Sequence, residues 1–258
     1  VQNDPLNRRI TAQTPIPFAW HEPIKGETTA IGTMGNCSGG VTPWKTILTA
    51  EENYQGYYGE TQYTEDGGEI HHPGSSRWEN FNQRPPEHYG WIVEVNPMTG
   101  ESRKLVGMGR CCHECATVFE APDGRIVVYS GDDAADECLY EFISEKPGDI
   151  TTGKLYVANT EQGKWVSLDI NEQAVLQEKF DSQTAVLIRL REASKLVGGT
   201  PLDRPEDIDI DPITGNVLVT LTNNGAKANF HGSILKITEK TADKLSLCLL
   251  YTSDAADE

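Results

Sequence analysis

Residues 207–222 read DIDIDPITGNVLVTLT, and this stretch decides how the chain is expected to fold. Isoleucine alternates with aspartate before the segment 211–215, and an apolar run follows that segment. Pro212 presets φ to the value that a type I turn needs, and Gly215 accepts the positive φ at the end of such a turn. The stretch therefore predicts two antiparallel strands joined by a tight turn.

The same design occurs earlier in the chain, where GWIVEV at residues 90–95 precedes NPMTG at residues 96–100. Further short apolar runs, bounded by glycine or polar residues, continue the pattern. These runs are GRIVVYSG at 124–131, CLYEFIS at 138–144, KLYVAN at 154–159, WVSLDI at 165–170 and GSILKITE at 232–239. Repeated hairpins are typical of propeller blades, so the chain is expected to be mainly β and to form a β-propeller. A β-sandwich with long loops is the alternative.

Two segments interrupt the β pattern. Between Asn171 and Leu196, the runs VLQEKF and AVLIRLREASKL place apolar residues at helical spacing, and Gly198 with Gly199 would end a helix. A helical insertion between blades is therefore predicted at about residues 171–197. Residues 54–83 are rich in Gly, Glu, Tyr and His without a clear period, which indicates a long surface loop that could lie over a site.

The composition is acidic, with 39 acidic and 22 basic residues and a formal charge of −17 in 258 residues. This charge would repel the phosphate backbone of nucleic acid, so no nucleic-acid partner is expected. An excess of carboxylates suits hard cations such as calcium, although a solvated acidic surface on an exported protein would look the same. No apolar run approaches the roughly 20 residues that cross a bilayer, so no membrane partner is expected either.

The last residues, 248–258, read CLLYTSDAADE. This string can be written back into a nucleotide sequence that closely resembles a transposase-type sequencing adapter. We therefore expect residues 248–258 to be an adapter-derived artefact and residues 1–247 to be part of a β-propeller domain. A natural strand and tail is the alternative, because DAADE also occurs at residues 133–137.

Four polar clusters do not resemble ordinary strands or turns. In the first, Cys37 lies in the glycine-rich run 35–40 and offers a soft thiolate, while Glu51 and Glu52 offer hard oxygen ligands. A structural cysteine in a tight turn is the alternative interpretation. Another cluster, SGDDA at residues 130–134, places two carboxylates at the end of a predicted strand, where a solvated turn is the alternative.

The two other clusters contain a thiol-rich run and an arginine. CCHEC at residues 111–115 could be interpreted as a zinc site. Its potential ligands are crowded, however, and no second ligand pair follows at the spacing that zinc sites use. Disulfide bonds to other cysteines are another possibility. In DRPED at residues 203–207, Arg204 precedes Glu206 by two positions and could bind an oxyanion through two N–H groups. Pro205 stiffens the link between them. A local surface ion pair is the alternative.

Taken in order, the clusters resemble the PhoX-type alkaline phosphatases. The matching stretches are NCSGG, TPW and LTAEEN, then GR with HE and Ala116, then GDDA and LYEF, and finally RPEDIDIDP with TGNVLVTLTNN. The resemblance runs from about Ile31 to Glu239 and is specific in combination, although each piece is weak alone. It implies a periplasmic or secreted β-propeller enzyme, monomeric when intact, that uses Fe³⁺ and Ca²⁺ to hydrolyse small phosphate esters for phosphate acquisition.

The resemblance also implies roles for individual residues. By resemblance, the residues that would bind iron are Cys37, Glu114 and Glu206. Those that would help to hold calcium are Glu52 and Asp133, and their neighbours Glu51 and Asp132 could exchange roles with them. Arg204 would bind the phosphate oxygens.

Some features depart from the family pattern. Cys115 stands where the family often has a small residue, and family members continue beyond Leu247 with further metal ligands. The propeller is therefore expected to be incomplete and the chain inactive alone. A calcium-dependent propeller hydrolase such as a lactonase, or a non-catalytic binding propeller, is the alternative. Cys37 and Arg204 distinguish a PhoX-type phosphatase from a lactonase, because a lactonase needs neither a thiolate nor an arginine beside its metal.

Overall fold

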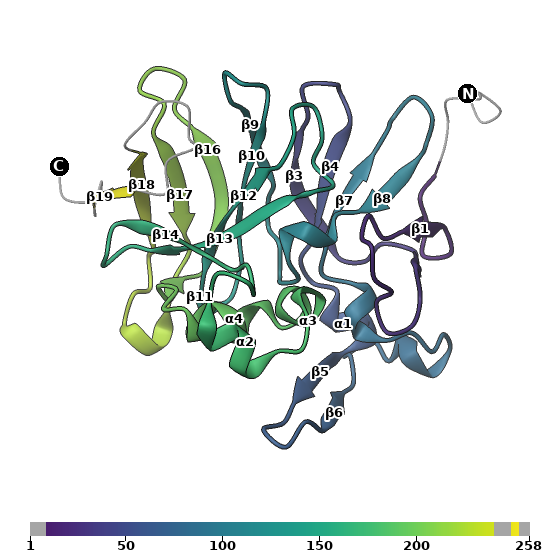
Figure 1. The fold of residues 1–258 in the computed structure, drawn as a ribbon. Helices are drawn as coiled ribbons and strands as arrows, with labels where there is room; N and C mark the ends of the chain where they lie inside the picture. Colours follow the sequence, from purple (N-terminus) through teal and green to yellow (C-terminus); the bar gives the residue numbers. More distant parts are fainter. Residues whose placement is uncertain (1–8, 240–248, 253–258) are drawn as a thin grey trace.

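The computed structural model describes residues 9–239 and 249–252, and three antiparallel sheets dominate it (Figure 1). The first sheet contains, in spatial order, β3 (Asn36–Val41), β4 (Ile47–Glu51), β7 (Ile92–Val95) and β8 (Ser102–Lys104). The second contains β9 (Thr117–Glu120), β10 (Ile126–Gly131), β12 (Leu139–Ser144), β13 (Gly153–Asn159) and β14 (Lys164–Ser167). The third contains β16 (Pro205–Ile210), β17 (Val217–Leu221), β18 (Ser233–Glu239) and β19 (Leu249–Thr252). The first strands of the three sheets pack beside one another, as the blades of a propeller do.

Both hairpins predicted from turn chemistry are confirmed. Residues 96–100 join β7 to β8, and residues 211–215 join β16 to β17, each pair being antiparallel. The Asn96 side chain accepts a hydrogen bond from the Met98 amide at 2.9 Å, and Asp211 accepts one from the Ile213 amide at 2.9 Å. These Asx-type contacts close each turn locally, which explains why the sequence alone revealed them.

The central strands of the middle sheet, β10 and β12, are buried on both faces, and this separates a propeller from a sandwich. All six residues of β10 are buried, and alternate side chains enter different cores. Ile126 and Val128 pack in the core that also contains Trp91 of the first sheet. Val127 and Tyr129 pack in the core that contains Val219 of the third sheet. The prediction of a mainly β propeller is confirmed, and the sandwich alternative is wrong.

The predicted helical insertion is confirmed as three short helices. They are α2 (Ala174–Lys179), α3 (Gln183–Ile188) and α4 (Leu190–Leu196), and they lie across one end of the sheets (Figure 1). The Ser182 hydroxyl caps α3 by accepting a hydrogen bond from the Ala185 amide at 3.2 Å. Gly198, with φ of 82°, follows the last helix as expected.

The expectation of a long surface loop at residues 54–83 is wrong in part. The segment contains α1 (Gln55–Tyr58), the hairpin of β5 (Glu60–Tyr63) and β6 (Glu69–His72), and the 3₁₀ turn η1 (Trp78–Asn80). The hairpin projects from the end of the molecule where the helices lie (Figure 1). Its sequences, ETQY and EIHH, are largely polar, so they gave no apolar period to recognise.

The remaining elements are short. Two further pairs of strands are β1 (Pro15–Pro17) with β2 (Thr29–Ile31), and β11 (Ala135–Glu137) with β15 (Leu202–Asp203). The other 3₁₀ turns are η2 (Pro86–His88), η3 (Val106–Met108) and η4 (Gly225–Lys227). In the described part of the chain, no helix has the length and apolar character needed to cross a membrane.

Strand β19 falls within the segment interpreted as an adapter-derived tail. It pairs with β18 at the edge of the third sheet, with Tyr251 opposite Ile237. Backbone pairing at a sheet edge is open to many extended segments, so this pairing leaves the origin of the tail a prediction. Residues 248 and 253–258 of that segment lie outside the described residues.

A fully buried ion pair holds the first sheet together at the same end as the helices. The Lys104 ammonium donates to both Glu51 carboxylate oxygens, at 2.7 and 2.9 Å, and both side chains are 0% exposed. Glu51 also accepts hydrogen bonds from the backbone amides of Met34, Gly90 and Trp91. Every oxygen of this buried carboxylate is therefore satisfied, which is what makes the charge tolerable in the interior.

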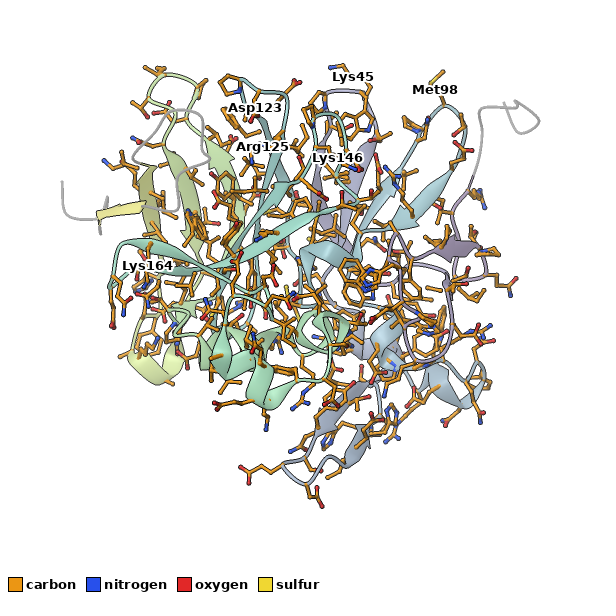
Figure 2. The ribbon with its side chains drawn as sticks, viewed as in Figure 1. Lys45, Met98, Asp123, Arg125, Lys146 and Lys164 are labelled. Atoms are coloured by element: carbon orange, nitrogen blue, oxygen red, sulfur yellow. The ribbon has the colours of Figure 1, made fainter. Side chains whose placement is uncertain are left out.

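Lys104→Met should destabilise the protein strongly, because it leaves Glu51 as an uncompensated buried charge. The expected loss is about 3–5 kcal/mol in the free energy of unfolding, measured by urea titration with tryptophan fluorescence. The control is Lys164→Met, which removes the same charge from an exposed position at the outer edge of the second sheet (Figure 2). Equal losses in the two variants would contradict the prediction.

Candidate metal centre

The predicted site residues all lie at the same end of three neighbouring sheets. Figure 2 marks Lys45 and Asp123 in the turns that join β3 to β4 and β9 to β10, at the end of the sheets away from the helices. The site residues occupy the opposite ends of these hairpins and of β16. They are Cys37 at the start of β3, Glu52 after β4, Glu114 before β9, Asp133 after β10, and Arg204 and Glu206 at the start of β16.

The fold brings the five predicted metal ligands into one cluster. The Cys37 thiol donates to Glu114 Oε1 at 2.8 Å, although the two residues are 77 positions apart. The ligand atoms of Cys37, Glu52 and Glu114 lie within 4.8 Å of one another, and so do those of Glu114, Asp133 and Glu206. Glu114 belongs to both groups, so the two groups form a continuous pair of cation-sized sites.

The electrostatics of the cluster fit a bound cation. Partial burial, followed by the nearby Glu114 charge, raises the pKa of Glu52 to about 7. The hydrogen bond to Glu114 and then burial raise the pKa of the Cys37 thiol to about 12. Carboxylates held together in this way repel one another, and a cation would offset the repulsion. A thiol and several carboxylates are also suitable donors for metals.

Arg204 contacts the cluster from an unfavourable backbone conformation. Its guanidinium donates to both oxygens of Asp133, at 2.9 and 2.8 Å, and lies 3.6 Å from Glu206. Its φ is +60°, in the left-handed region that side chains disfavour, directly before Pro205. The main partner is thus a carboxylate from another sheet, and the interpretation of Arg204 as part of a purely local ion pair is wrong.

Glu51 and Asp132 do not take the places of Glu52 and Asp133. Glu51 is enclosed by the Lys104 ion pair, and Asp132 is 0% exposed and held by Arg191 at 2.7 Å through two separate hydrogen bonds. In each acidic doublet, the first residue points into the scaffold and the second points into the cluster. The suggested exchange of roles within the doublets is therefore wrong.

Only Glu114 of the CCHEC run joins the cluster. His113 is fully buried, with Nδ1 at 2.7 Å from the Ser130 hydroxyl and Nε2 at 2.9 Å from the Gly109 carbonyl, so both ring nitrogens have partners. Within residues 9–239, all five cysteines are free, which argues against the disulfide alternative. The described residues also contain no zinc-like group around Cys111 and Cys112.

A separate cavity of about 670 Å³ lies beside the first sheet, away from the carboxylates. Glu94 lines it and already accepts hydrogen bonds from Trp44, Thr46 and Arg103. The clustered side chains are the stronger candidate site, because the neighbours of Glu94 already occupy its carboxylate.

Sequence reasoning missed the two cations that support the cluster. Lys104 lies at the end of β8, and Arg191 lies on α4, both far along the chain from the carboxylates they hold. Neither residue lies in a recognisable motif. Only the closely spaced Arg189 and Arg191 in the run LIRLREASKL, residues 187–196, could have drawn attention to Arg191.

Comparisons with known proteins show what the chain is similar to. A family model described as "Alkaline phosphatase PhoX" matches residues 1–256. Among solved structures, the chain is similar to Pseudomonas fluorescens PhoX in complex with vanadate, a transition state analogue, with a TM-score of 0.84 and 28% sequence identity. The match covers 97% of this chain and 54% of that chain, so the chain spans about half the length of the structure it matches. No curated protein sequence matches the chain.

Glu52→Gln should stabilise the chain in the presence of a chelator, because it removes one of the mutually repelling charges. The pKa of Glu52 is raised from 4.5 to about 7, so the ionised Glu52 lowers the free energy of unfolding increasingly as pH rises through this range. The advantage of the variant should therefore appear above pH ~4.5 and level off above pH ~7, as measured by thermal melting. Glu120→Gln, at an exposed position on β9 outside the cluster, is the control. A melting curve of Glu52→Gln that follows the control at every pH would refute the repulsion argument.

Proposed function

The chain belongs to the PhoX family of alkaline phosphatases, and from this membership we propose that it is part of a metal-dependent enzyme that hydrolyses phosphate monoesters to inorganic phosphate. The observation that carries the proposal is the contact between Cys37 and Glu114 beside the Arg204–Asp133 pair. It combines a thiol, carboxylates and a guanidinium at one place. The matched Pseudomonas protein holds vanadate, a transition state analogue, which supports phosphoryl chemistry for the family.

The proposed cofactors are Fe³⁺ and Ca²⁺. Cys37 and Glu114 would hold iron together with Glu206, because a thiolate favours a transition metal over a hard alkaline-earth ion. Glu52 and Asp133 would help to hold calcium, which prefers carboxylate oxygens. When bound, the metals supply positive charge and Lewis acidity to the phosphate group.

The residues of the chain supply position and charge. Arg204 presents a planar guanidinium that can pair with two phosphate oxygens, and Asp133 fixes the direction of that plane through two hydrogen bonds. The same hydrogen bonds raise the pKa of Arg204, so the side chain stays charged. The fixed backbone at Arg204, whose carbonyl accepts from the Thr222 amide at 3.2 Å, limits reorganisation during the reaction.

The activity, substrates and location of the whole protein are proposals, because the chain spans about half of the PhoX chain it matches. We propose small phosphate esters as substrates, a monomer when intact, and a periplasmic or secreted location with a role in phosphate acquisition. Nucleic acid is disfavoured as a partner by the net charge of −17.

Arg204→Lys should lower turnover, because an ammonium cannot reproduce the planar two-donor fork. In the protein extended to the full family length, kcat/KM for p-nitrophenyl phosphate should fall about ten-fold or more, or about 1.4 kcal/mol. The control is Arg125→Lys, because Arg125 also pairs with an aspartate, at 2.8 Å from Asp123, but at the opposite end of the sheets (Figure 2). Unchanged kinetics for Arg204→Lys would remove Arg204 from the site.

Cys37→Ser should reduce bound iron more than bound calcium. A neutral hydroxyl is a poor substitute for a thiolate at a transition metal, while the oxygen ligands stay in place. Elemental analysis of the purified protein, extended to the full family length, measures the metal stoichiometry. Cys138→Ala alters a buried cysteine outside the cluster and should leave both metals unchanged. If Cys37→Ser retains its iron, Cys37 is a structural residue.

A further inference from the structure

Arg191 on α4 contacts the two segments that carry site carboxylates Glu114 and Asp133. Its Nε donates to Asp132 Oδ2 and its Nη2 to Asp132 Oδ1, both at 2.7 Å. Its Nη2 also lies 3.2 Å from the Cys112 sulfur. Asp132 directly precedes Asp133, and Cys112 lies two residues before Glu114. One guanidinium from the helical insertion therefore reaches two separate parts of the centre.

The contacts around Arg191 fix these segments relative to each other. Asp132 Oδ1 accepts a hydrogen bond from the Cys112 amide at 3.2 Å, and the Asp133 amide donates to the Cys112 carbonyl at 3.0 Å. The third segment, which carries Glu52, is joined through Gln55, whose side-chain amide lies 3.5 Å from the Cys112 sulfur. Arg191 is thus at the junction of the three segments that hold Glu52, Glu114 and Asp133.

The burial of Asp132 makes this junction stiff. Asp132 is 0% exposed, whereas the Arg191 side chain is 38% exposed. Other charged groups face the pair: Glu137 lies 3.9 Å from Arg191 and is itself held by Lys195 at 2.9 Å. A buried carboxylate that lost its bidentate partner would have to move or recruit water, and the adjacent Asp133 would move with it.

We propose that Arg191 is a positioning residue of the metal centre, so that the helical insertion sets the geometry of the carboxylates without contacting the metal or substrate. The inference rests on the proposed function, since it requires a cation at the cluster. Bidentate geometry is essential to the role. A lysine would retain the positive charge but could not orient the Asp132 carboxylate through two parallel hydrogen bonds. Partners that orient metal ligands typically change metal affinity by about 10- to 100-fold when mutated.

The test measures the Ca²⁺ affinity of the protein extended to the full family length, by calorimetry well below the melting temperature, for the wild type and for Arg191→Lys. We expect Arg191→Lys to weaken Ca²⁺ binding by about 10-fold or more and to reduce the rise in melting temperature that Ca²⁺ produces. The matched control is Arg189→Lys, two positions away in the same insertion. Arg189 pairs with Glu192 and stacks on Tyr63 and Phe180, so it is structurally engaged without touching the centre.

The outcomes separate a positioning role from a purely structural one. If both variants melt lower but bind Ca²⁺ within two-fold of the wild type, Arg191 is only structural and the inference is wrong while the metal centre stands. If the wild type itself binds no Ca²⁺, the calcium part of the proposed function fails, and the positioning role fails with it.

A second variant covers the possibility that Arg191→Lys does not fold. The double variant Asp132→Asn with Arg191→Gln replaces the ion pair by two neutral amides and leaves no uncompensated buried charge. It should fold, as judged by circular dichroism, and should still show weakened Ca²⁺ binding, because the rigid fork is absent. Ca²⁺ binding equal to that of the wild type in this folded double variant would overturn the inference.

Discussion

The candidate centre depends on two ion pairs with buried carboxylates, Glu51 with Lys104 and Asp132 with Arg191. Each buried carboxylate directly precedes a residue of the cluster, Glu52 or Asp133. Successive side chains at a strand end point in opposite directions, so fixing the first residue of the doublet in the scaffold aims the second at the site. Removing Lys104 or Arg191 would disturb both the buried core and the candidate centre. The buried carboxylate and the carboxylate of the cluster are adjacent residues on the same backbone segment.

The site itself works against stability. Glu52, Glu114, Asp133 and Glu206 come together from all three sheets, and partial burial, followed by repulsion from Glu114, raises the pKa of Glu52. Arg204 adds a residue with positive φ before a proline, which costs about 1–3 kcal/mol elsewhere in proteins. The two packed interfaces of the middle sheet hold this arrangement, since its central strands β10 and β12 are buried on both faces. A rigid scaffold with a strained, charged centre is typical of sites that bind ions and react.

Local chemistry explains which parts of the fold were predictable. The hairpins at residues 96–100 and 211–215 are closed by their own side chains, so their sequences were sufficient. The hairpin of β5 and β6 was missed because distant residues stabilise it: Tyr63 donates to Glu87 at 2.7 Å and lies under both Lys25 and Arg189. Its strands carry no apolar alternation, so nothing within residues 54–83 revealed it.

By itself, the sequence determined the hairpins, the approximate place of the helical insertion and the residue types of the candidate centre. Only the tertiary structure decided which member of each acidic doublet enters the cluster, and it alone revealed Lys104 and Arg191. The reason is the range of the interactions. Turns and alternation depend on neighbours within a few residues, whereas Asp132 and Arg191 are 59 positions apart and Glu51 and Lys104 are 53 apart. A buried charge pairs with an opposite charge that the packing of the sheets and helices places beside it. No short stretch of sequence therefore identifies the partner.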